Sequence, residues 1–126
     1  MDVPTVTVLK MKEEKVIKMS DEEFYKHMEE NILTEHGEFR CVKEIFCCDG
    51  FHMSVQCSKG HYCSPRETLP FKSYSAFEVG FPSKKEDLIM KYVEDESIPT
   101  KTVYGGVPLD TILKVIDKHG GIKVKE

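Results

Sequence analysis

Apolar and polar residues alternate along several short stretches of the chain, a pattern typical of half-buried β-strands. The clearest two stretches, residues 39–48 and 51–58, flank Asp49-Gly50, a dipeptide that tolerates the positive φ angles of a two-residue hairpin turn. A turn of that length places Cys47 opposite His52, with both side chains on the same face of the ladder. The other face carries the apolar side chains and is expected to join the core: Phe46, Cys48, Phe51, Met53, Val55 and Cys57.

The remaining stretches predict helices and further strands. Helices are expected over residues 21–33, 84–93 and 108–119, where apolar residues recur every three or four positions. The first two begin with capping-box sequences at Ser20 and Ser83, in which a serine precedes a glutamate by three residues. Strands are expected over residues 74–80 and 102–104, and an N-terminal hairpin over residues 5–11 and 15–19.

These elements predict one α+β domain over residues 1–126, with an antiparallel sheet of about four strands and three helices mainly on one face. The chain of 126 residues is too short for two ordinary domains. Its longest uninterrupted apolar run, Ile45 to Cys48, is far shorter than a membrane span, and the first residues lack the blocks of a signal peptide. We therefore expect a cytoplasmic protein without a membrane partner.

The cysteines are concentrated in one part of the chain. All 5 cysteines lie between Cys41 and Cys63, together with His52 and His61. An odd number of cysteines without a secretory signal argues against a disulfide framework. In a reducing compartment, such a cluster more often binds a metal or takes part in catalysis.

Zinc prefers four nitrogen or sulfur ligands in a tetrahedron. The predicted ligand set is Cys47 and His52 from the hairpin, with His61 and Cys63 from the long loop that follows it. Four protein ligands would make the zinc structural, so that it staples the loop to the domain. Two other interpretations stay open: Cys57 or Cys48 replaces one ligand, or the cysteines are small apolar core residues.

Sequence motifs give little support for an enzyme. The patterns H-E-x-x-H, G-x-S-x-G and G-x-x-x-x-G-K-[ST] do not occur in the sequence. Cys63 and His61 are residue types that serve as nucleophile and base in some enzymes, and Arg66 is close to them in sequence, so a small hydrolase or nuclease is one alternative. We expect a protein that is not an enzyme.

The charge of the chain limits its partners. With 22 acidic and 18 basic residues, the net charge of −4 differs from the dense positive field of a general nucleic-acid binder. The acidic run Glu94, Asp95 and Glu96 is either a solvated face or a contact with the basic groove of a protein partner.

Several short sequences between Phe51 and Ile122 make the chain resemble a family of small uncharacterised proteins encoded by phages and prophages. These sequences are Tyr62-Cys63-Ser64-Pro65-Arg66, Glu78-Val79-Gly80-Phe81-Pro82-Ser83, Thr102-Val103-Tyr104-Gly105 and Lys118-His119-Gly120-Gly121. The resemblance implies that the protein belongs to a mobile element.

Small acidic phage proteins without catalytic motifs are often inhibitors of host defence, and the resemblance therefore implies an anti-CRISPR protein. Its expected partner is the type II CRISPR effector nuclease, a host protein that it would bind without contacting nucleic acid, so that DNA loading is blocked. One alternative is a zinc-containing nucleic-acid-binding or regulatory module, which predicts that the protein alone binds DNA or RNA in a salt-dependent way. The other is a small hydrolase or nuclease.

Overall fold

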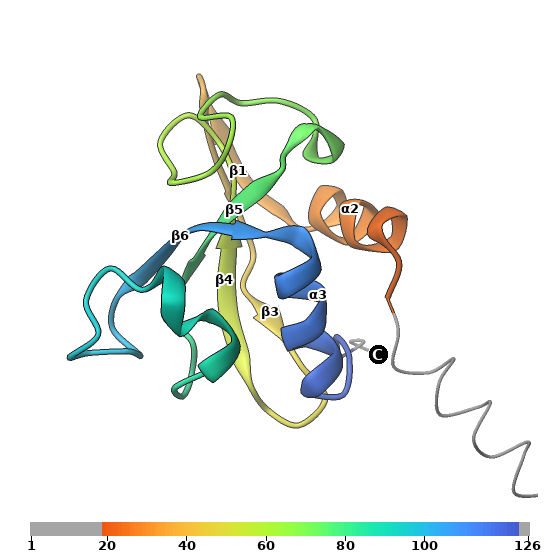
Figure 1. Ribbon diagram of the computed structural model, residues 1–126. Helices are drawn as coiled ribbons and strands as arrows, with labels where there is room; N and C mark the ends of the chain where they lie inside the picture. Colours follow the sequence, from red (N-terminus) through yellow and green to blue (C-terminus); the bar gives the residue numbers. More distant parts are fainter. Residues whose placement is uncertain (1–18, 124–126) are drawn as a thin grey trace, which may run out of the picture.

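The computed structural model describes residues 19–123 (Figure 1). The elements are α2 (Asp21–Glu30), β1 (Ile32–His36), β2 (Phe39–Val42), β3 (Ile45–Phe46), β4 (His52–Gln56), the 3-10 helix η1 (Phe71–Ser73), β5 (Ala76–Gly80), the 3-10 helix η2 (Asp87–Tyr92), β6 (Val103–Pro108) and α3 (Leu109–Lys118). The hairpin predicted over residues 5–11 and 15–19 lies outside the described residues apart from Met19, so it stays a prediction.

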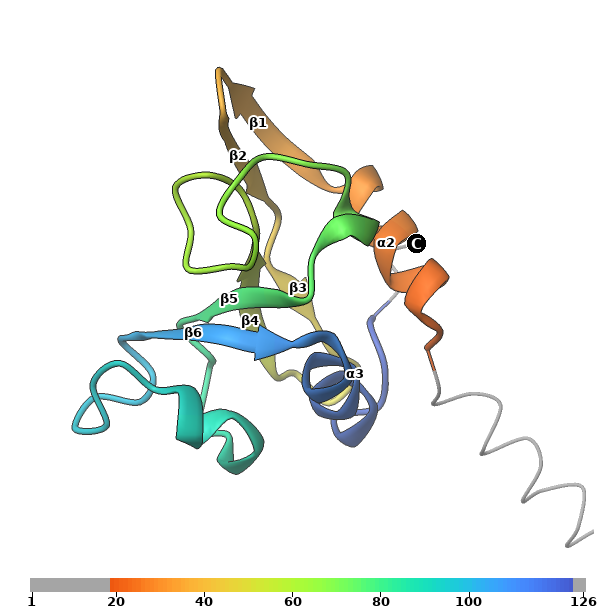
Figure 2. The ribbon, with the colours of Figure 1, turned by 45° about the horizontal axis from the view of Figure 1, so that its top comes forward.

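The main sheet has four antiparallel strands in the order β3-β4-β5-β6. A separate antiparallel hairpin, β1-β2, extends away from this sheet (Figure 2). None of the helices within residues 19–123 is long and apolar enough to span a membrane. The predicted α+β class is confirmed, with the antiparallel sheet at its centre.

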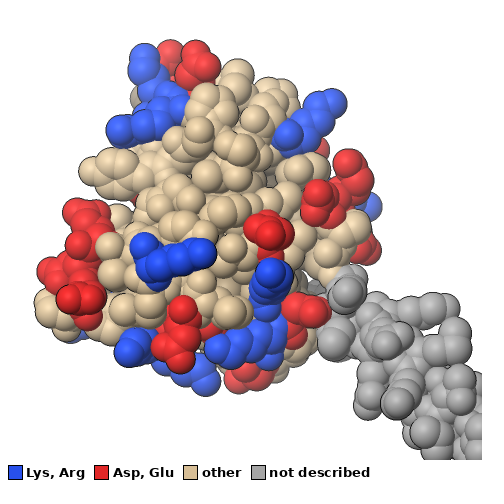
Figure 3. All heavy atoms as spheres, viewed as in Figure 1, with Lys and Arg blue, Asp and Glu red and all other residues tan. Residues whose placement is uncertain are grey.

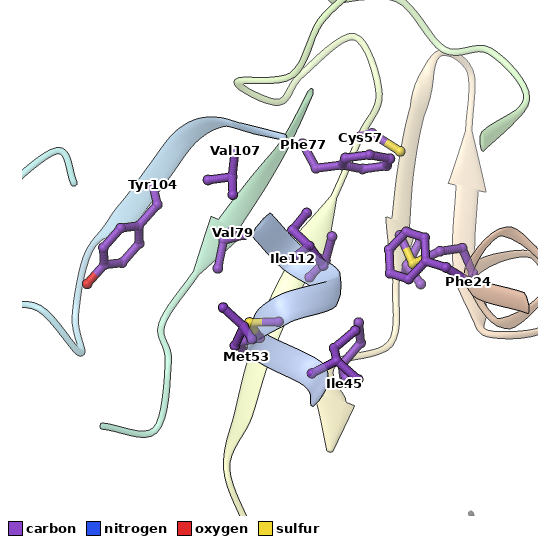
Figure 4. Packing of buried hydrophobic residues seen from close by; sticks show 14 of the residues in the cluster. Phe24, Ile45, Met53, Cys57, Phe77, Val79, Tyr104, Val107 and Ile112 are labelled. Carbon is purple, nitrogen blue, oxygen red and sulfur yellow. The ribbon is translucent and has the colours of Figure 1, made fainter. Parts of the chain in front are cut away.

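The hydrophobic core lies between the sheet and the two α-helices. Helix α3 covers one face of the sheet and α2 lies beside its end (Figures 1 and 4). Phe24 of α2 meets Phe77 of β5 edge to face, with ring centroids 5.7 Å apart. Ile112 and Ile116 of α3 are fully buried, and burial of each such side chain contributes roughly 1.5–3 kcal/mol.

Helix α2 begins as predicted and ends earlier than predicted. The Ser20 hydroxyl accepts a hydrogen bond from the Glu23 amide at 3.1 Å, and the Glu23 carboxylate accepts one from the Ser20 amide at 2.9 Å. The helix stops at Glu30 because the β-formers that follow pair as strand β1. Gly37 has a φ of 64° in the turn between β1 and β2.

The predicted register of the β3-β4 hairpin is wrong by one residue. The Cys47 amide donates to the Phe51 carbonyl and the Gly50 amide donates to the Cys47 carbonyl, so the loop has three residues instead of two. Gly50 takes a φ of 97°, the conformation that lets a three-residue loop close. His52 consequently pairs with Phe46, and Cys47 pairs with Phe51.

A shift of one residue in the pairing register moves every side chain of a strand to the opposite face of the sheet. Ile45 and Cys47 are therefore buried in the core, whereas Phe46 and Cys48, which were predicted to be buried, are exposed. The predicted burial of Cys57 is confirmed.

The second predicted capping box does not start a helix. The Ser83 hydroxyl accepts a hydrogen bond from the His52 amide at 3.0 Å, and the Ser83 amide donates to the His52 carbonyl at 2.8 Å. These bonds hold the segment against β4. The helical turn starts only at Asp87, where the Glu86 carboxylate accepts a hydrogen bond from the Leu88 amide at 3.0 Å.

Candidate functional site

The structure places the four predicted zinc ligands in three different environments. Cys47 lies on the core face of the hairpin turn, where burial raises the pKa of its thiol to about 12. His52 lies on the opposite face, with its Nδ1 3.2 Å from a carboxylate oxygen of Glu44. His61 and Cys63 lie together in the loop that follows β4, which is the only part of the predicted set that the fold brings together.

The predicted ligand set therefore does not fit a zinc ion in this arrangement. A zinc ion held by Cys47 and His52 requires these residues to be cross-strand neighbours on one face, and the observed register separates them. Among residues 19–123, no group of three or more His, Cys, Asp or Glu side chains is arranged to hold a metal ion. The presence of zinc stays a prediction, without support from the geometry of these four residues.

The zinc prediction has a direct test in the metal content of the purified protein. If zinc is bound through the loop, Cys63→Ser releases it and lowers the melting temperature, because structural zinc contributes folding free energy. Cys41→Ser is the matched control, since Cys41 is not part of the predicted set. Equal zinc content in the two variants, measured by inductively coupled plasma mass spectrometry, contradicts the ligand set.

The loop after β4 holds His61 and Cys63 in a dense hydrogen-bond network. The Ser58 hydroxyl is 2.7 Å from His61 Nδ1, and the Cys63 Sγ is 3.3 Å from the carbonyl oxygens of both Ser58 and Pro65. A sulfur in that position donates its hydrogen, and burial raises the pKa of the Cys63 thiol. Cys63 is thus held as a neutral thiol, which is the opposite of an activated nucleophile.

Arg40 anchors this loop to strand β2. Its guanidinium is buried, lies 3.9 Å from the centre of the Phe71 ring and donates to the Cys57 carbonyl at 2.9 Å. Burial raises the pKa of the neighbouring Cys57 thiol to about 12. The cation–π contact and the hydrogen bond offset part of the cost of burying the charge, so the arrangement is structural.

A buried ionic network, which the sequence did not reveal, connects three distant segments. His119, at the end of α3, has Nε2 2.7 Å from Glu86 Oε1 and Nδ1 2.7 Å from Asp49 Oδ2. Lys118 Nζ is 2.8 Å from Glu86 Oε2. The Phe51 ring stacks on the His119 ring, with 4.0 Å between centroids and 9° between planes.

Hydrogen bonds keep the two carboxylates of this network ionised. Burial raises the pKa of the Glu86 carboxyl, but hydrogen bonds from Lys118, the Leu88 amide and His119 outweigh burial and hold that pKa below its ordinary value. The Phe51 amide and His119 lower the pKa of Asp49 in the same way. Because each carboxylate accepts hydrogen bonds from several donors, this network fixes the hairpin turn and η2 to the end of α3.

Phe81 has a backbone conformation that is rare for a residue with a bulky side chain. It is the one non-glycine residue within 19–123 with a positive φ, at 50°, and 53% of its surface is exposed. A bulky side chain in this region is a true conformational outlier, worth about 1–2 kcal/mol of strain. Strained residues of this kind are concentrated at binding and catalytic sites.

The start of β6 separates Phe81 from the predicted partner-binding residues Glu94, Asp95 and Glu96. Its amide donates to the Thr102 carbonyl at 3.0 Å, while the Glu94 amide donates to the adjacent Val103 carbonyl at 3.0 Å. Phe81 and Glu94 therefore flank the same short stretch of chain, about 10 Å apart by strand spacing.

The acidic side chains of this region face solvent. Glu94, Asp95 and Glu96 are exposed, and acidic atoms gather on the left of Figure 3, over the loop between η2 and β6. Residues 94–101, here called the acidic loop, hold three acids and one lysine. The Asp95 carboxylate accepts hydrogen bonds from the amide and the hydroxyl of Ser97, and these bonds stabilise the turn of the chain at Asp95.

No protein-family model, curated protein sequence or solved structure matches this chain.

Proposed function

We propose that the protein acts by binding another protein, as a stoichiometric inhibitor of a nucleic-acid-handling host enzyme. The observation that carries this proposal is the exposed, conformationally strained Phe81, which lies across the start of β6 from the acidic loop. Aromatic side chains that are exposed in the free protein are the typical anchors of protein interfaces. A strained backbone that presents one of them is unfavourable for folding alone, which supports a role in binding.

The acidic loop specifies the chemistry of the partner. Three carboxylates across the start of β6 from an aromatic anchor favour a surface rich in lysine and arginine, the kind of surface with which an enzyme binds DNA or RNA. An acidic protein in such a groove competes with the nucleic acid for the same positive charges. The proposed mechanism is thus a block of DNA loading without any chemical step.

The type II CRISPR effector nuclease is the target that we propose. This choice is supported by the resemblance to small phage and prophage proteins, and by the match between the acidic loop and a DNA-binding channel. The nucleic-acid-binding module and the small hydrolase have no observation here that favours them, because Cys63 is held as a neutral thiol and the exposed loop is acidic.

The experiment is a DNA-loading assay with the purified effector, its guide RNA and increasing amounts of the protein. We expect inhibition that saturates near equimolar protein, and weaker inhibition by the variant Glu94→Gln/Glu96→Gln, which leaves the Asp95 turn intact. At low salt, this variant should associate with the effector several-fold more slowly than the unmodified protein, because charges at the rim of an interface mainly steer association.

The matched control is Glu29→Gln/Glu30→Gln, which removes the same charge from exposed positions of α2. An effector that binds DNA normally in excess protein contradicts the proposed target. Equal rates for the two double variants contradict a contact through the acidic loop. Salt-dependent binding of DNA by the protein alone would favour the nucleic-acid-binding module instead.

A further inference from the structure

The segment that follows α3 covers the edge of the main sheet. Residues 120–123, here called the C-terminal strap, run antiparallel to β3: the Cys48 amide donates to the Gly121 carbonyl at 2.9 Å, and the Lys123 amide donates to the Phe46 carbonyl at 2.7 Å. An uncovered edge strand presents free amide and carbonyl groups that can pair with another chain. The strap therefore closes the edge of β3.

The strap reaches β3 because α3 ends in a sharp turn. Gly120 and Gly121 both have a φ of 88°, and their amides donate to the Asp117 and Ile116 carbonyls. This is a Schellman motif, which reverses the chain directly after a helix. The Asp49 amide also donates to the His119 carbonyl at 3.2 Å, so the hairpin turn and the strap are attached to the same residue.

The His119 ring sits between two carboxylates that already have other donors. Glu86 Oε2 accepts from Lys118 and the Leu88 amide, and Asp49 Oδ1 accepts from the Phe51 amide. Both carboxylates are therefore ionised, and both ring nitrogens must donate, which only a doubly protonated imidazolium can do. The stacked Phe51 ring and the carboxyl end of α3 also favour a positive charge at this position.

From this arrangement we infer that the charge on His119 controls whether the C-terminal strap stays on β3. The neutral ring has one N–H, which it keeps on Glu86, since that carboxylate is only 1% exposed and cannot turn to water. A ring lone pair then faces Asp49, whose side chain is 43% exposed and free to turn to solvent. The β3-β4 hairpin turn and the C-terminal strap are both attached to His119, so both are held less firmly when the ring is neutral.

Other charges act on the same network. Lys118 pairs with Glu86 from α3, and Lys84 acts on Asp49 from the segment between β5 and η2. Lys118 does not replace the proton of His119, because it is engaged with the other oxygen of Glu86. Loss of that one proton therefore leaves the network with an excess negative charge.

The test is amide hydrogen exchange by nuclear magnetic resonance across a pH titration. The Cys48 and Lys123 amides should lose on the order of tenfold in protection factor between about pH 6 and about pH 9, whereas core amides of β5 keep theirs. Nitrogen-15 chemical shifts should show that both ring nitrogens of His119 carry protons while the strap is protected. A single proton there, or constant protection of the two strap amides, overturns the inference.

Variants separate the charge from a general loss of stability. His119→Gln should leave the strap amides weakly protected at both pH values, and His36→Gln, a change of an exposed histidine in β1, should behave like the unmodified protein. If His119→Gln fails to fold, Asp49→Asn serves, because an amide can face either form of the ring and so removes the pH dependence. A pH dependence that survives Asp49→Asn contradicts the proposal.

Discussion

Replacement of Glu86 by alanine should lower the free energy of unfolding by about 3–5 kcal/mol, because it breaks the buried pair that Glu86 forms with His119. Glu86 is almost fully buried, and it holds His119 at 2.7 Å and Lys118 at 2.8 Å. Without the carboxylate, the His119 ring has no acceptor on the side of η2. Urea unfolding followed by circular dichroism measures the change.

Two further variants test whether the loss of unfolding free energy comes from breaking the pair of Glu86 and His119. Glu35→Gln removes an exposed carboxylate of β1 and should change the unfolding free energy by less than about 0.5 kcal/mol. The double variant Glu86→Leu/His119→Leu should lose less than the sum of its two single changes, because it removes both partners and leaves no buried charge. Additive losses would contradict coupling between the two residues.

The same network sets the response of the protein to acid. The pKa of Glu86 is lowered by its hydrogen bonds, which outweigh burial, so its contribution is present above the ordinary glutamate range and is lost as the pH falls through the lowered pKa. The unfolding free energy of the unmodified protein should therefore decline on the acid side. Glu86→Ala should show a shallower decline across the same range.

The sequence predicted the local elements better than it predicted which residues meet. The Ser20 capping box, the strand around Phe77 and the helix predicted over residues 108–119 all depend on neighbours within a few residues, and the structure confirms them. The hairpin was placed correctly, but its turn has three residues, and that one extra residue reversed the faces of Cys47 and Cys48. The zinc ligand set depended on that register.

The ionic network could not be predicted, because its members are far apart in the sequence. Asp49 and His119 are 70 positions apart, and Glu86 and His119 are 33 positions apart. Locally, Asp49 looks like an ordinary turn residue and Glu86 looks like part of a capping box. Sequence periodicity carries no information about such pairs, which are fixed by how α3 packs against the sheet.

Phe81→Gly should separate binding from stability, because it should weaken partner binding while leaving the fold as stable or more stable. A glycine adopts the φ of 50° without strain, which should return up to about 1 kcal/mol to the folded state. Loss of an aromatic anchor should cost about 2 kcal/mol or more of binding free energy, roughly a 30-fold weaker complex. Thermal unfolding and isothermal titration calorimetry with the effector measure the two effects.

Phe81→Ala and Leu33→Ala complete this test. Phe81→Ala removes the same ring but keeps a side chain in the strained conformation, so it should bind as weakly as Phe81→Gly and gain less stability. Leu33 is an exposed apolar residue on β1, and its removal should leave binding unchanged. If Phe81→Gly binds as tightly as the unmodified protein, Phe81 is not an anchor. If it unfolds more easily, the Phe81 ring supports the fold, and the strained backbone is not a sign of a binding role.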